Sequence, residues 1–191
     1  MTDDDLIIED VASWRRWLDT HEADEDGVWL VLAKKGTSSP TSLSYDQALD
    51  EALCSGWIDG PKRRRDERTF LQRFTPRRAR SMWSARNVEH IARLEGEGRM
   101  RARGRAEVER AKVDGRWDRA YAGSASAEPP EVLTRALDAD PRARAAFDGL
   151  SRAERYSILH PLMTAPSAQT LESRLQRALE RLRAAASTST P

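Results

Sequence analysis

Arginine, tryptophan and acidic side chains are concentrated between Cys54 and His90. Asp59 ends a short apolar segment just before Gly60, and Arg73 lies on a second segment that we expect to pair with the first. An arginine beside an indole ring can hold a planar carboxylate or phosphate by bidentate hydrogen bonds and stacking. Two interpretations follow: an Asp59–Arg73 ion pair that fixes a hairpin, or a pocket for a small anionic ligand. The candidate pocket residues are Trp57, Asp59, Arg73, Arg77, Trp83 and Asn87.

The same region is strongly basic, although the whole chain has a net charge of only +1. Ten bases and two acids lie in residues 61–86, whereas ten acids and two bases lie in residues 1–26. The acidic segment can neutralise the basic one within the chain, or the basic segment can bind an anionic partner. A nucleic acid is one such partner, but the pI of about 7.9 is lower than the value of roughly 9 or more typical of dedicated binders. Its candidate contacts are Lys62, Arg63, Arg64, Arg65, Arg77, Arg78 and Arg80.

Motifs for metal binding and for catalysis are missing from the sequence. The three histidines lie far apart, and Cys54 is the single cysteine, so we predict no metal site and no internal disulfide. The chain contains no GxxxxGK[ST] or GxSxG motif, and its GEGRMRARG segment lacks the spacing of a dinucleotide-binding loop. We therefore assign no catalytic residue and no cofactor, and the sequence leaves open whether the protein is an enzyme.

Hydrophobic periodicity predicts alternating helices and strands in the first part of the chain. Strands are expected at 27–34, 57–64 and 69–75, the last two paired as a hairpin. Along the third strand, Phe70, Gln72 and Phe74 should share one face. Helices are expected at 9–22, at 44–55 behind a Ser44–Gln47 capping box, before Gly96, and at 103–113.

The rest of the chain is predicted to be helical. A helix should follow Pro130, and others should span 141–149, 151–163 and 167–185. The fold class is therefore α+β: a small, mainly antiparallel sheet flanked by helices, followed by an all-helical C-terminal segment. We divide the chain into an α+β domain at 1–121, a linker at 122–130 and a helical segment at 131–186.

Features of the whole sequence bear on where the protein functions. No apolar run approaches the roughly 20 residues that a membrane helix needs, so we predict no membrane insertion. The acidic start MTDDDLIIED is unlike a secretion signal, which begins with basic residues. Together with the single cysteine, this predicts a cytoplasmic protein.

Several blocks of the sequence resemble the YdeI/OmpD-associated family of bacterial proteins. They are YDQALDEALCSGWIDG (45–60), RFTPRRARSMWSARN (73–87), GRM (98–100) and AKVDGRWDRAY (111–121). The resemblance begins near Trp14 and extends to about residue 185. The family usually has an AK-x-x-E-T-R turn between its last two helices, and residues 164–171 lack the Lys and Arg of that turn.

The resemblance implies a bacterial protein associated with bacteriocin protection and stress tolerance, and it implies no catalytic mechanism. We therefore expect a protein that acts by binding an unidentified protein partner or a small anionic ligand. Nucleic-acid binding through residues 62–86 is the first alternative. A ligand-binding or enzymatic site around Asp59, Arg73 and Trp83 is the second.

Overall fold

Alternation along residues 69–76 produces the central strand of the sheet. Within residues 5–188, which this computed structural model describes, three antiparallel strands form one sheet in the order β1-β3-β2. Phe70, Gln72 and Phe74 are buried on one face of β3, as predicted, whereas Leu71 and Arg73 are half-buried on the other. The strands are β1 (Val28–Ala33), β2 (Trp57–Arg64) and β3 (Thr69–Pro76).

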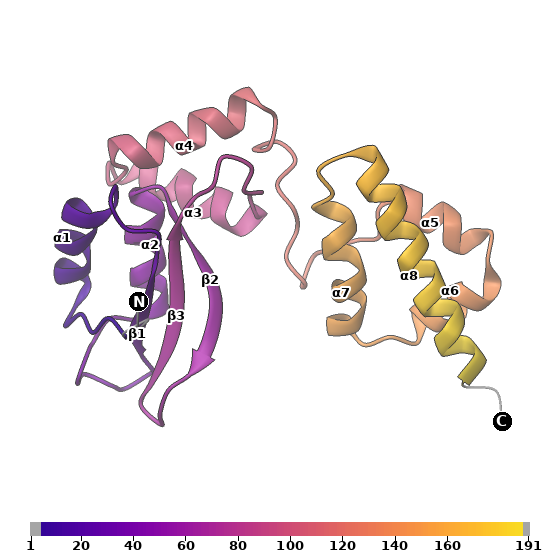
Figure 1. Ribbon diagram of the computed structural model, residues 1–191, viewed down its shortest axis with the longest axis horizontal. Helices are drawn as coiled ribbons and strands as arrows, with labels where there is room; N and C mark the ends of the chain where they lie inside the picture. Colours follow the sequence, from indigo (N-terminus) through magenta and orange to yellow (C-terminus); the bar gives the residue numbers. More distant parts are fainter. Residues whose placement is uncertain (1–4, 189–191) are drawn as a thin grey trace. The chain divides into compact units, whose positions relative to one another are not determined.

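Two helices pack against this sheet, and Figure 1 shows them side by side next to it. They are α1 (Val11–His21) and α2 (Tyr45–Cys54). The Trp14 indole of α1 is fully buried, donates a hydrogen bond to the Ala48 carbonyl of α2 at 3.1 Å and packs on Phe74 at 5.8 Å between ring centroids. The predicted capping box is present at the start of α2, where Ser44 and Gln47 bond each other's backbone N–H.

Two further helices lie at the end of the sheet where β2 begins and β3 ends (Figure 1). They are α3 (Ala85–Gly96) and α4 (Ala102–Val113). Gly56 ends the α2 segment with a φ of +75°, a left-handed conformation that favours glycine, and the chain then enters β2. Gly104 of α4 lies directly against the last carbonyls of α2, so α2 and α4 approach more closely than a side chain would permit.

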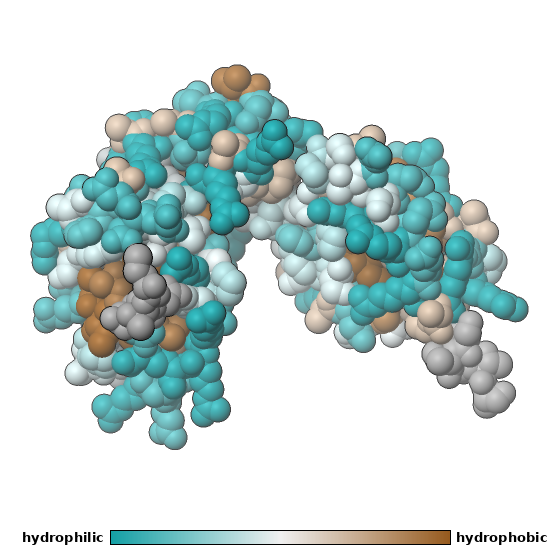
Figure 2. Space-filling view, viewed as in Figure 1, coloured by the Kyte–Doolittle hydropathy of each residue, from teal (hydrophilic) through white to brown (hydrophobic). Residues whose placement is uncertain are grey.

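The C-terminal helices form a core of their own. Leu133, Phe147, Leu159, Leu175 and Leu182 belong to one buried cluster. Figure 2 shows mostly hydrophilic side chains on the visible surface around these helices, with small apolar patches between them. A capping box from Ser151 to Glu154 starts the third helix, as predicted. The helices are α5 (Glu131–Asp138), α6 (Pro141–Asp148), α7 (Arg152–Met163) and α8 (Ala168–Thr188).

The contacts divide the chain into two compact units. The N-terminal unit extends to Trp83 and includes Asn87–Arg119, and the C-terminal unit comprises Ser84–Arg86 and the chain from Ala120 onward. The predicted α+β fold class with an all-helical C-terminal segment is confirmed. The linker at 122–130 and the exact domain bounds remain predictions. Among the described residues, no helix is both long enough and apolar enough to cross a membrane.

Candidate functional site

Trp57, the first candidate pocket residue, is part of the core. Its indole is fully buried, and its Nε1 donates a hydrogen bond to the Glu22 carbonyl at 3.2 Å. The ring meets Trp17 of α1 edge-on, with 5.9 Å between centroids. Trp57 therefore anchors the start of β2 against α1 and its following turn.

Asp59 and Arg73 point to opposite faces of the sheet. Asp59 lies opposite Phe74 in the register and accepts a hydrogen bond from the Tyr45 hydroxyl of α2 at 2.8 Å. Arg73 follows the other face, where it lies opposite Trp29 with its guanidinium carbon 5.9 Å from the Trp29 ring centroid. Neighbouring residues of a strand alternate between faces, so Asp59 shares the face of Phe74 and Arg73 takes the opposite one. This register does not support the predicted Asp59–Arg73 ion pair.

Arg77 and Trp83 are brought together in the loop after β3. The guanidinium carbon of Arg77 lies 3.5 Å from the Trp83 ring centroid, and Trp83 in turn meets Trp117 edge-on at 4.9 Å. Arg77 and Trp83 are 7% and 1% exposed, and Asn87 at the start of α3 is also buried. Arg77 and Trp83 thus form a buried cation–π stack. Asp59 and Arg73 are not part of this stack.

The basic residues proposed for nucleic-acid binding have different environments. Lys62, Arg63 and Arg64 are exposed on β2, which is an edge strand. The Lys62 ammonium lies 4.1 Å from the Phe70 ring centroid, and the Arg63 guanidinium carbon lies 3.8 Å from that of Trp29. Within residues 5–188, no carboxylate forms an ion pair with these three cations. We call Lys62, Arg63 and Arg64 the β2 basic edge.

The remaining candidates lie in the loops beside the strands. Arg65 is neutralised by Asp5 at 3.2 Å and by Asp66 at 3.0 Å, so the acidic N-terminal segment compensates one base of this stretch. Hydrogen bonds from the Thr69 hydroxyl and backbone, aided by the Arg68 backbone, lower the pKa of Asp66 to about 2 and fix the β2–β3 turn. Arg78 and Arg80 are exposed in the loop after β3.

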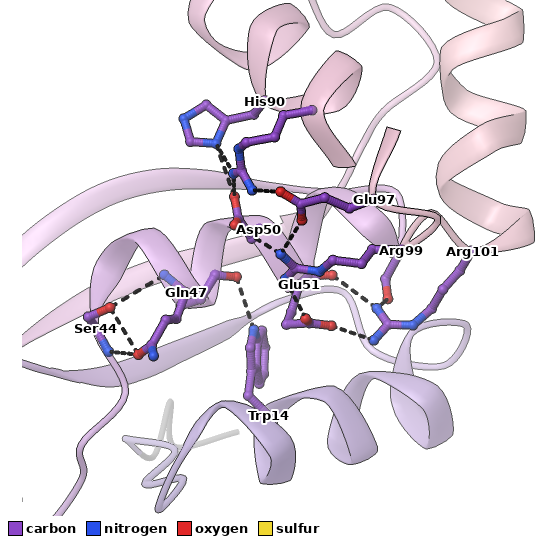
Figure 3. A network of polar contacts seen from close by, with 12 residues as sticks. Trp14, Ser44, Gln47, Asp50, Glu51, His90, Glu97, Arg99 and Arg101 are labelled. Carbon is purple, nitrogen blue, oxygen red and sulfur yellow. Dashed lines mark hydrogen bonds and ion pairs between the residues drawn. The ribbon is translucent and has the colours of Figure 1, made fainter. Parts of the chain in front are cut away.

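A buried ion-pair network joins α2 to α3 and α4, and the sequence analysis missed it (Figure 3). Glu51 is 5% exposed, and its two carboxylate oxygens accept from Arg99 at 2.8 Å and from Arg101 at 2.6 Å. The neighbouring Asp50 accepts from Arg93 at 2.6 Å and contacts the His90 ring at 3.0 Å. The signal available in the sequence was an adjacent pair of acids flanked on both sides by apolar residues of α2, because buried charges require partners.

The electrostatics of this network favour a charged Asp50 carboxylate and a neutral Cys54 thiol. Burial raises the pKa of Asp50, but hydrogen bonds from Arg93 and His90 outweigh it, so the pKa lies below its ordinary value. Burial, together with the negative charge of Glu51, raises the pKa of the Cys54 thiol to about 11. Cys54 is fully buried and protonated at neutral pH, so it has little nucleophilic character.

No group of three His, Cys, Asp or Glu residues in the described chain is arranged to hold a metal ion. The polar core of the N-terminal unit instead connects its elements: Arg101 contacts Glu51, the Ser55 hydroxyl at 2.6 Å and Asp19 of α1 at 3.0 Å. One side chain thereby ties α1, α2 and α4 together. These contacts stabilise the fold of the N-terminal unit. The cations of the β2 basic edge take no part in them.

Two family models match this chain. Residues 6–107 match a domain of unknown function, DUF8412, and residues 126–185 match the family described as "Bacteriocin-protection, YdeI or OmpD-Associated". No curated protein and no solved structure matches. The predicted resemblance to the YdeI/OmpD-associated family is thus found over the C-terminal helices. It does not span nearly the whole chain, because the blocks at 45–60, 73–87 and 98–100 lie within the DUF8412 match. The chain belongs to the DUF8412 family through residues 6–107, and its helical C-terminal part is similar to the YdeI/OmpD-associated family.

Proposed function

We propose that this protein acts by binding an acidic, extended segment of a protein partner along the β2 basic edge. We further propose that it does so in the bacterial cytoplasm, as a stress-tolerance or bacteriocin-protection protein. The match of residues 126–185 to a family described by bacteriocin protection supports that part of the second proposal. The observation that carries the first is an exposed edge strand with three consecutive cations that have no carboxylate partner within residues 5–188.

An edge strand offers a partner two kinds of interaction. Its outer backbone N–H and C=O groups can pair with an added strand, which supplies affinity without sequence preference. Side chains along the same strand then select the partner by charge. Lys62 and Arg64 lie opposite Gln72 and Phe70 on one face of the sheet, and Arg63 lies opposite Leu71 on the other. An acidic strand would therefore meet cations on both of its faces.

The two alternatives are less well supported. A pocket that uses Trp57 and Trp83 would have to open the core, because both indoles are buried. A nucleic acid would need a wider basic surface. Arg77 is stacked on Trp83, and Arg65 is paired with Asp5, so both are already engaged. Lys62, Arg63, Arg64, Arg78 and Arg80 remain exposed for such a contact.

Fluorescence anisotropy distinguishes these partners. The full chain is titrated against a labelled Asp/Glu-rich decapeptide and against a labelled single-stranded DNA 20-mer, at several salt concentrations. We expect the decapeptide to bind, and the double variant Lys62→Glu/Arg64→Glu to weaken its binding at least about tenfold, or roughly 1.4 kcal/mol. Arg142→Glu, a charge reversal at an exposed position of α6, is the matched control and should bind normally.

Several outcomes would contradict the proposal. If the decapeptide does not bind at low salt, or if the double variant binds it as tightly as the wild type does, the β2 basic edge is not the binding site. Binding of DNA but not of the peptide would favour the nucleic-acid alternative. That alternative also predicts a linear fall of log K with log salt, with a slope of about −0.7 per phosphate contacted on a single strand.

A further inference from the structure

A second basic feature belongs to the C-terminal unit and uses none of the basic residues discussed above. Helices α7 and α8 line an open cavity of about 550 Å³. This volume lies within the range of roughly 300–1,000 Å³ that is typical of small-molecule sites. Arg174, Arg177 and Arg181 of α8 line it, and Ile158 and Ala178 contribute its apolar part.

The three arginines form a stripe of like charge. They are separated by three and four positions, which places them on one side of α8. Like charges at this spacing repel one another, so a bound anion would reduce the repulsion and stabilise α8. Within residues 5–188, no carboxylate forms an ion pair with any of the three. The positive charge of Arg181 contributes to lowering the pKa of Glu154, but less than the hydrogen bonds from Ser151 do.

One of these arginines is held in place by the neighbouring helix. Pro161 lies within α7, near its C-terminal end, where carbonyl groups lack helical partners. Arg174 donates from Nη1 to the Pro161 carbonyl at 2.5 Å, and it is half-buried. Arg177 donates from Nε to the Ser173 carbonyl at 3.2 Å, which leaves its terminal nitrogens outside that bond. Backbone carbonyls therefore orient the guanidinium groups of Arg174 and Arg177, and no carboxylate within residues 5–188 forms an ion pair with either.

His160 adds a neutral ring to the cavity wall. Burial, together with the positive charge of Arg174, lowers the pKa of His160 below its ordinary value. The ring is packed edge-on against Tyr121 at 4.8 Å between centroids, and it is tilted against Tyr156 at 5.5 Å. A neutral imidazole can donate one hydrogen bond to a ligand without adding to the positive charge of the three arginines.

We infer that this cavity binds a small organic phosphate. The arginines of α8 would bind the phosphate group, because a planar guanidinium matches phosphate oxygens in a bidentate geometry and three cations offset a dianion. Ile158, Pro161 and Ala178 would contact the organic part of the ligand. The site uses neither the β2 basic edge nor a protein partner, so it stands or falls independently of the proposed function.

Isothermal titration calorimetry on the full chain tests this inference with four probes: AMP, ribose 5-phosphate, inorganic phosphate and citrate. We expect AMP or ribose 5-phosphate to bind with a Kd below about 1 mM and more tightly than inorganic phosphate. The variant Arg174→Gln/Arg177→Gln should weaken binding at least about tenfold, and Arg174→Lys should not restore it, because lysine cannot bind in a bidentate manner. Arg142→Gln and Lys62→Glu/Arg64→Glu should bind as the wild type does.

Each contrary result is decisive. Absence of binding by both organic phosphates at millimolar concentration overturns the inference. Citrate that binds as tightly as AMP overturns the phosphate assignment, and equal binding of inorganic phosphate overturns the contact with an organic part. Circular dichroism of the arginine variants must show wild-type helix content, because Arg177 is exposed but Arg174 is half-buried and bonds the Pro161 carbonyl. If a variant loses helix, Arg181→Gln provides the same test from an exposed position of the cavity lining.

Discussion

The close approach of α2 and α4 gives a sharp prediction for Gly104. A Cβ atom at this position would lie 2.2 Å from the Cys54 carbonyl oxygen and 2.9 Å from the Leu53 carbonyl oxygen. Real Cβ contacts do not fall below 3.0 Å, so Gly104→Ala must move backbone against backbone by about 0.8 Å, the difference between 3.0 and 2.2 Å. No flexible side chain is present at that contact to absorb the change.

The expected free-energy change combines two opposing effects. Overpacking a well-packed interior costs about 1–3 kcal/mol, whereas replacing glycine by alanine inside a helix gains about 1 kcal/mol. Here the overpacked atoms are backbone, and the shift also lengthens the hydrogen bond from the Arg101 N–H to the Cys54 carbonyl, now 3.1 Å. We therefore expect Gly104→Ala to lower the free energy of unfolding by about 1–2 kcal/mol.

Gly96→Ala is the matched control. Gly96 ends α3, and a Cβ atom there would find no heavy atom within 4 Å, so the variant should be as stable as the wild type or slightly more so. Urea unfolding followed by tryptophan fluorescence suits both variants, because all six tryptophans lie between residues 14 and 117 and report on the N-terminal unit. A Gly104→Ala protein as stable as Gly96→Ala would refute the close approach of α2 and α4.

Three further predictions concern buried groups of the N-terminal unit. Trp57→Ala should lower the free energy of unfolding by about 3–5 kcal/mol because its fully buried indole leaves a cavity, and a urea-unfolding loss below about 1 kcal/mol would contradict its core position. The folded-state pKa of Asp50 is depressed, so its stabilisation is present above the unfolded pKa and is lost as pH falls through the folded pKa. The urea midpoint should therefore fall on acidification below about pH 5, and less steeply in Asp50→Asn; equal pH profiles would refute this role. Cys54, with a pKa of about 11, should react with a thiol reagent at pH 8 only after unfolding in urea, and rapid labelling of the native protein would show that it is accessible.

Local signals in the sequence determined much of the fold. The Ser44–Gln47 capping box and the alternation along β3 depend on residues within a few positions of each other, and both are present as predicted. The predicted pairing of residues 57–64 with residues 69–75 is present as the antiparallel β2–β3 pair. Such features can be read from the sequence because the interactions that favour them are local.

The environment of individual side chains depended on geometry that the sequence does not specify. The register shifts between Asp59 and Lys62, and Asp59 lies on the face of α2 while Arg73 lies on the face of Trp29. A shift of one residue in a strand exchanges the two faces, so spacing alone could not exclude an Asp59–Arg73 pair. The Asp50–Arg93 contact joins residues 43 positions apart and required the placement of α3 against α2.

The arginines of this protein separate into two groups by their partners, and this separation is itself testable. Arg99 and Arg101 bind the buried carboxylate of Glu51, so removing either leaves a buried charge unpaired and should destabilise the fold. Arg64 and Arg177 are exposed and have no carboxylate partner within residues 5–188, so their removal should leave stability nearly unchanged. A charge that contributes little to folding is available to a partner. If Arg64→Gln or Arg177→Gln destabilised the protein as much as Arg101→Gln, these exposed cations would be structural and neither surface would be available for a ligand.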